Sequence, residues 1–89
     1  MKKPTEALPY LERAVVLDPD YVGTHVRLGR LYHATQNHAS ARAALEEAIQ
    51  INPFDPTIHH LLAQVYTALG DPDRARESQE RLRKLVRSN

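Results

Sequence analysis

Two prolines set the period of this chain. Pro19 and Pro53 are 34 residues apart (53 − 19). The stretch between them places apolar and small residues at fixed offsets, namely His25, Leu28, Gly29, Tyr32, Ala41, Leu45 and Ala48. The residues after Pro53 repeat this arrangement as His59, Leu62, Ala63, Tyr66 and Ala75. A repeat of this length with small residues at fixed positions is typical of stacked helix hairpins.

Apolar spacing and helix-end signals predict an all-α chain of five antiparallel helices. The expected ranges are 2–18, 22–35, 38–51, 56–69 and 72–87. Pro9 does not suit a helix interior, because it removes a backbone hydrogen bond and crowds the preceding turn. We therefore expect the first turn to be frayed or kinked and the firm helix to begin near Leu8. The expected N-caps are Asp20 or Tyr21, Asn37, Asp55 and Asp71, with Gly70 as a C-cap.

On these residues the chain resembles the tetratricopeptide repeat family, whose pattern is W-x2-L-G-x2-Y…A-x3-F…P. The middle copy matches it at Leu28, Gly29, Tyr32, Ala41 and Pro53, with Leu45 in the Phe slot. His25 and His59 stand where the family usually has Trp, and Gln79 stands in the second Phe slot. The resemblance implies an α-solenoid of two and a half repeats in a single domain, 1–89. Its parts are a half repeat (1–18), a repeat (19–52) and a repeat with a basic terminal helix (53–89).

Composition narrows the classes of function. The net charge of +1 argues against a dedicated nucleic-acid binder, which would usually be clearly basic. The chain has no Cys, so it forms no disulfide framework. No apolar run approaches the roughly 18–20 residues of a membrane span, and no signal peptide follows Met1. We expect a cytoplasmic protein.

Neither metal binding nor catalysis is predicted from the polar residues. The chain has five His but no Cys and no His-x3-His. We expect His25 and His59 to be half-buried aromatics between helices, and the other His residues to be partly solvated. Glu46, Glu47, Glu77 and Glu80 are expected on solvent-facing stripes, with i, i+4 pairs such as Glu77–Arg81. We therefore expect a protein that is not an enzyme and has no cofactor.

The best candidate site is a groove along the first helices of successive repeats. In proteins that this chain resembles, these helices line a concave surface that holds a peptide or helix. At 100° per residue, this surface would be formed by Val26, Arg27, Arg30, His33, His60, Leu61, Gln64 and Thr67. The surface is mildly basic, so the leading hypothesis is a protein interaction scaffold with an acidic protein or peptide partner.

Two alternatives remain from the sequence. The first helix lacks a partner helix before it, and its apolar stripe predicts self-association as a homodimer through Ala7, Leu11, Ala14 and Val15. We expect the chain to be the C-terminal end of a longer array, because the last helix has polar Gln79 and Arg83 on its outer face. A nucleic-acid adaptor using the basic last helix is less favoured, since acids interrupt Arg74, Arg76, Arg81, Arg83, Lys84 and Arg87 and no aromatic residue is interleaved for base stacking.

Overall fold

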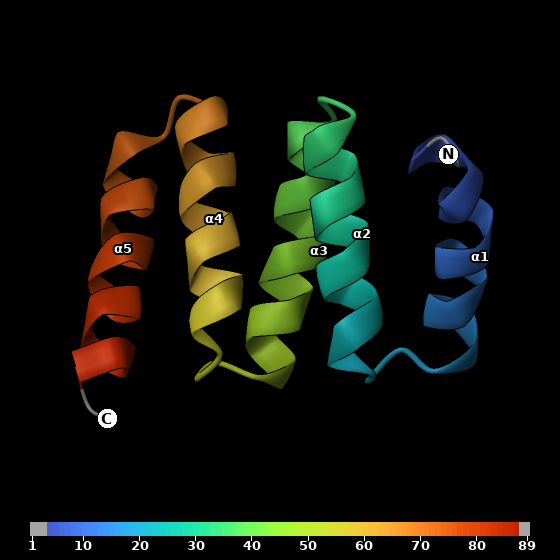
Figure 1. Ribbon diagram of the computed structural model, residues 1–89, viewed down its shortest axis with the longest axis horizontal. Coiled ribbons are helices and arrows are strands. Elements are labelled where there is room, and N and C mark those ends of the chain that lie inside the picture. The colour runs from blue at the N-terminus through green and yellow to red at the C-terminus, as the bar shows by residue number, and fades with distance from the viewer. Residues whose placement is uncertain (1–3, 88–89) are drawn as a thin grey trace.

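The computed structural model describes residues 4–87 as five α-helices joined by short turns. The helices are α1 (Pro4–Leu17), α2 (Val22–Ala34), α3 (His38–Ile51), α4 (Pro56–Ala68) and α5 (Pro72–Arg87). Figure 1 shows them side by side, each reversing the direction of the helix before it. The predicted all-α fold of antiparallel helix hairpins is confirmed. The helix bounds agree with the expected ranges to within one residue, except that residues 2 and 3 of the first expected helix lie outside the described residues.

The core lies in the middle of the stack. Leu45 of α3 and Ile58 and Val65 of α4 are the largest side chains that are fully buried. Ala41 and Ala48 of α3 are also fully buried. Because alanine side chains are small, α3 can approach its neighbours closely at these two positions.

Gly29 shows why a glycine stands in the middle of α2. A β-carbon built on Gly29 would come within 2.5 Å of Cγ of Leu45 on α3. A mid-helix glycine costs about 1 kcal/mol relative to alanine, and the close approach of α3 accounts for it here. The prediction that this glycine marks a close helix contact is confirmed.

Two of the expected N-caps form and two do not. Asp55 accepts a hydrogen bond from the backbone N–H of Thr57 at 2.9 Å, and Asp71 accepts one from the N–H of Arg74 at 3.2 Å. Tyr21 and Asn37 occupy N-cap positions, but neither side chain bonds its helix. Instead, the Asn37 side-chain amide donates to Thr35 Oγ1 at 3.2 Å, so the expected capping role of Asn37 was wrong.

Gly70 and Pro9 shape the remaining helix ends. Gly70 follows Leu69, the C-cap residue of α4, and has a φ of 78°, in the left-handed region that glycine enters without strain. The first helix runs without a break from Pro4 through Pro9, whereas we expected firm helix only from Leu8. Pro9 lies so near the start of α1 that only one backbone hydrogen bond, to the first turn, is lost.

Two histidines at equivalent positions join α2 and α4 to the turns before them. The Nε2 of His25 lies 2.7 Å from the carbonyl oxygen of Pro19, and that of His59 lies 2.8 Å from the carbonyl oxygen of Pro53. A carbonyl only accepts, so each Nε2 donates a proton and the tautomer is fixed. Both rings are buried, so the expectation that they would be half-buried was wrong. Their hydrogen bonds satisfy the nitrogen that burial would otherwise leave unpaired.

Candidate functional site

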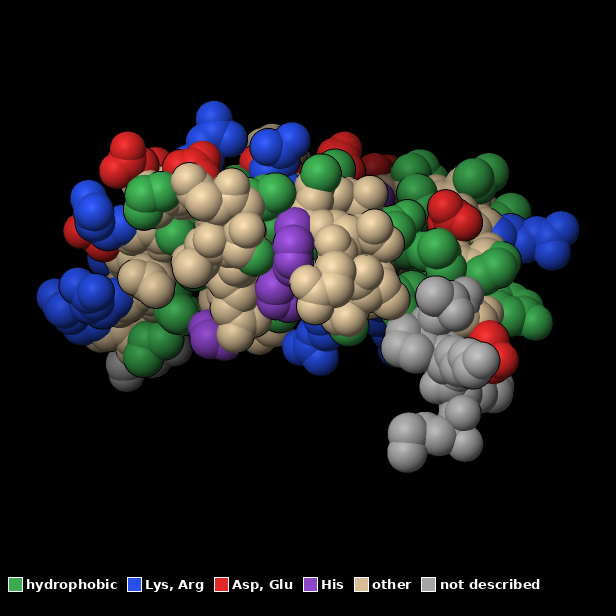
Figure 2. Space-filling view, turned by 90° about the horizontal axis from the view of Figure 1, so that it is seen from above, with side chains coloured by type: hydrophobic (Ala, Val, Ile, Leu, Met, Phe, Trp, Pro, Cys, Tyr) green, Lys and Arg blue, Asp and Glu red, His purple; other side chains and the backbone are tan. Residues whose placement is uncertain are grey.

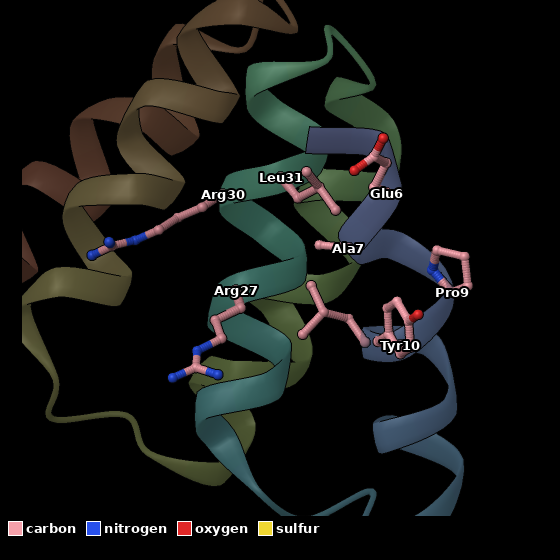
Figure 3. Close-up of a pocket in the computed structure, with 8 residues that line it drawn as sticks. Glu6, Ala7, Pro9, Tyr10, Arg27, Arg30 and Leu31 are labelled. Atoms are coloured by element: carbon pink, nitrogen blue, oxygen red, sulfur yellow. The ribbon is translucent and has the colours of Figure 1, made fainter. Parts of the chain in front are cut away.

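A cavity of about 920 Å³ lies between α1 and α2. Its walls come from the first half of α1 and the middle of α2, and apolar and charged side chains both contribute. The lining residues are Glu6, Ala7, Pro9, Tyr10, Leu11, Arg27, Arg30 and Leu31. Figure 3 shows Ala7 of α1 and Leu31 of α2 facing each other across this space. A cavity of this size is in the range of ligand-binding sites in proteins.

The charged and apolar parts of this site lie on different sides of α2. In Figure 3 the side chains of Arg27 and Arg30 extend from α2 away from α1. Both residues are exposed, whereas Leu31 is partly buried. The arrangement offers an apolar floor between the two helices and two guanidinium groups beside it. A ligand with apolar and acidic groups on one face would match both parts.

The internal repeat shows what covers the same surface elsewhere in this chain. One period later, the counterparts of Ala7 and Leu11 are Ala41 and Leu45. Both counterparts are fully buried, and α2 contributes Gly29 to the contact with Leu45. In α1, by contrast, Ala7 is exposed and Leu11 is partly exposed. Among the described residues, no helix covers α1 as α2 covers α3.

The structure divides the predicted groove into separate parts. Arg27 and Arg30 line the α1–α2 cavity. Four of the other predicted residues line a second hollow of about 400 Å³ between α2, α4 and α5, namely His33, His60, Gln64 and Thr67. Val26 and Leu61 pack against the buried core instead. These two side chains therefore hold α2 and α4 in place and offer little free surface.

The predicted self-association residues lie along α1 with graded exposure. Ala7 is exposed, and Leu11, Ala14 and Val15 are partly buried. Tyr10 was not among the predicted residues, although it lines the α1–α2 cavity and is 78% exposed. Its spacing of three residues from Ala7 and four residues from Ala14 was the available signal, because residues three and four apart lie on the same face of a helix.

A polar cluster joins α3, α4 and α5. The hydroxyl of Tyr66 donates to Glu46 Oε2 at 2.6 Å, and Arg74 and Arg42 approach the same carboxylate at 3.9 and 4.0 Å. Burial and then the hydrogen bond to Glu46 raise the pKa of Tyr66 from 10.0 to about 12. Burial, followed by the charge of Glu12, also raises the pKa of Tyr32. Glu46 thus forms a helical i, i+4 pair with Arg42, as expected, and in addition binds across helices to Tyr66 and Arg74.

Three basic residues of α5 form ion pairs with acids of the same helix or of the turn before it. Arg74 lies 3.6 Å from Asp71, Arg76 lies 3.9 Å from Asp73, and Arg81 lies 3.1 Å from Glu77. The predicted Glu77–Arg81 pair is thus confirmed. Figure 2 shows acidic and basic side chains intermixed at the end of the stack that α5 forms. Such pairing lowers the positive potential that a phosphate backbone would meet.

A pair of histidines meets at the turn between α2 and α3, a contact that was not predicted. The Nδ1 atoms of His33 and His38 lie 3.2 Å apart. Their spacing of five residues across an expected tight turn was the available signal. Within residues 4–87, no group of three or more His, Cys, Asp or Glu side chains is arranged to hold a metal ion. None of the five described helices has the length and apolar character needed to cross a membrane.

The fold, the repeating glycine and alanine contacts and the uncovered end helix define a helical-repeat protein. The chain belongs to the tetratricopeptide repeat family, which it matches over residues 1–64 and again over 34–87. No curated protein matches the chain. Proteins of this family typically serve as scaffolds for protein–protein interactions.

Proposed function

We propose that this chain is a non-catalytic scaffold that binds a peptide or helix with acidic side chains. The ligand places apolar side chains in the α1–α2 cavity and acidic side chains over Arg27 and Arg30. The proposal rests on one observation: an uncovered apolar stripe of α1 lies beside two exposed Arg residues of α2. Apolar burial supplies affinity in such a site, and the charges favour acidic partners over basic ones.

The internal repeat supplies a probe for this site. Because α2 covers the counterparts of Ala7 and Leu11, a peptide with the sequence of residues 22–34 is a probe for the surface that α1 leaves uncovered. We would prepare it with a helix-stabilising staple, since isolated helices of this length are marginal in water. One version keeps both Arg residues of the segment, and the other has the changes Arg27→Glu and Arg30→Glu. Binding to the 89-residue chain is measured by calorimetry.

We expect the acidic peptide to bind at least tenfold more tightly than the basic one, because the basic version would bring Arg close to Arg. Arg30→Glu in the chain should weaken the binding of the acidic peptide by about 1.4 kcal/mol or more, which is a tenfold loss of affinity. Leu11→Glu should weaken the binding of both peptides. A matched control is Arg83→Glu, which changes an exposed Arg of α5 outside the cavity. The proposal would be contradicted if the two peptides bound with equal affinity and Leu11→Glu left both affinities unchanged.

Self-association is the second candidate function. In addition to the stripe already described, α1 exposes Val16 and Leu17, with 80% and 78% of their side chains accessible. Large apolar side chains gathered on one element favour contact with another protein surface. Two copies meeting through α1 would bury this stripe by the simplest symmetry, a two-fold axis.

Light scattering from micromolar to millimolar concentration separates the two candidates. A dimer through α1 predicts a rise in molar mass with concentration that Leu11→Glu abolishes. Arg30→Glu should leave the rise in molar mass unchanged, although it weakens the binding of the acidic peptide. A monomer at every concentration, with or without Leu11→Glu, would rule out self-association and leave the peptide-binding proposal standing.

A further inference from the structure

The last turn of α2 and the first residue of α3 bring two imidazole rings together. The Nδ1 atoms of His33 and His38 lie 3.2 Å apart, and the ring centroids lie 5.1 Å apart with planes tilted by 57°. Both side chains are partly exposed, so solutes reach them. Figure 2 shows histidine side chains gathered near the middle of the face on which the α2–α3 turn lies. The groove proposal makes no use of His38.

The turn between the two helices fixes this separation. Gln36 has a φ of 67°, in the left-handed region, and reverses the chain between the rings. The backbone N–H of Asn37 donates to the carbonyl of Tyr32 at 2.7 Å, and Thr35 Oγ1 donates to the carbonyl of Leu31 at 3.0 Å. A turn with this many hydrogen bonds holds the two side chains in place before any ligand arrives.

The distance between the nitrogens matches the bite of a metal ion. Zinc binds imidazole nitrogen at about 2.0–2.1 Å in tetrahedral geometry, which places two such nitrogens about 3.3–3.4 Å apart. The observed 3.2 Å differs from this by about 0.1–0.2 Å. We propose that His33 and His38 form a binding site for a divalent transition-metal ion, with both Nδ1 atoms as ligands.

The chemistry of the pair selects the class of ion. Without metal, two Nδ1 atoms at this distance share one proton, which one ring donates to the other. With metal, the ring that donated gives up its Nδ1 proton and takes one up on Nε2, so both rings carry their proton on Nε2 and both Nδ1 lone pairs bind the ion. Imidazole suits zinc, nickel and copper, whereas calcium and magnesium require oxygen ligands. Water completes the coordination, because the described residues offer no third ligand arranged with these two.

The test is a titration of the 89-residue chain, free of any tag, with zinc chloride. Calorimetry should detect one site. Either His33→Gln or His38→Gln should lower the zinc affinity at least tenfold, and the double variant should lower it no further, because one remaining imidazole binds weakly. His60→Gln is the comparison variant, because His60 is an exposed histidine of α4 that lines the same hollow as His33 but is not hydrogen-bonded to the pair. It should leave the affinity within twofold of the original.

Three further measurements separate metal binding from folding defects. Circular dichroism without metal should give the same helix content for every variant. Zinc should raise the melting temperature of the unchanged chain, because it binds the folded state, and a chelator should reverse the rise. Nitrogen NMR should show both ring protons on Nε2 in the zinc-bound form. Absence of binding at millimolar zinc, equal affinity in His38→Gln, or loss of binding only in His60→Gln would each overturn the proposal.

Discussion

Gly29 of α2 and Leu45 of α3 lie in direct contact across the central helix hairpin. A β-carbon on Gly29 would come 2.5 Å from Cγ of Leu45, closer than carbon atoms normally approach. Leu45 has no exposed surface, so the surrounding core confines it. The contact therefore fixes how near the two helices lie, and it leaves no room for a side chain on α2 at this point.

Gly29→Ala is expected to lower the free energy of unfolding by about 1–3 kcal/mol through overpacking. Urea denaturation monitored by circular dichroism measures the change. The matched control is Gly23→Ala, whose β-carbon would lie 3.0 Å from the ring of Tyr21. Tyr21 is 57% exposed, so its ring can move aside. The higher helix propensity of alanine should therefore leave the stability unchanged or raise it by up to about 1 kcal/mol. An increase in stability for Gly29→Ala would contradict the packing described here.

His59→Phe is expected to destabilise the fold by about 0.5–1.5 kcal/mol, because the hydrogen bond to the carbonyl of Pro53 is lost while the ring volume is kept. Thermal unfolding gives the measurement. The neighbouring His60 is exposed, so His60→Phe is the control and should change the melting temperature little. If the two variants behaved alike, the buried hydrogen bond would contribute nothing to stability.

Tyr66 is expected to titrate near pH 12 in the folded protein, above its ordinary pKa of 10.0. Because the folded state holds this proton more tightly than the unfolded state, the contribution to stability is fully present below pH 10. It is lost as the pH rises from about 10 to about 12. Tyrosinate absorbance should show a late titration step that Tyr66→Phe removes. Titration of all four tyrosines together near pH 10 would contradict this expectation.

Asp55→Ala is expected to cost about 0.5–2 kcal/mol, because the N–H of Thr57 loses its capping acceptor at the start of α4. Asn37→Ala offers a comparison at the start of α3, where the side chain forms no capping bond. Its cost should stay below about 0.5 kcal/mol, as for other surface substitutions. Chemical denaturation of both variants measures the free energy of unfolding. Equal decreases in the two variants would mean that the capping hydrogen bond of Asp55 does not stabilise the fold.

The sequence by itself determined the period, the helix bounds and the positions of close packing. Residues that end or begin helices act on the backbone only within a few positions, so the helix bounds follow from the local sequence. Here these residues are Pro19, Pro53, Asp55 and Gly70. Gly29 was also readable, because a glycine inside a helix needs a reason such as the approach of a neighbour. These features depend on spacing along the chain, which the sequence states directly.

The tertiary structure alone decided which polar groups meet and which apolar surface stays uncovered. Tyr66 and Glu46 are 20 residues apart and meet because α3 and α4 pack together. The rings of His33 and His38 meet because the turn between their helices reverses the chain. No local pattern sets these distances, since they depend on how side chains from different helices are oriented after packing. The cavity between α1 and α2 arises in the same way, from the absence of a covering helix among the described residues.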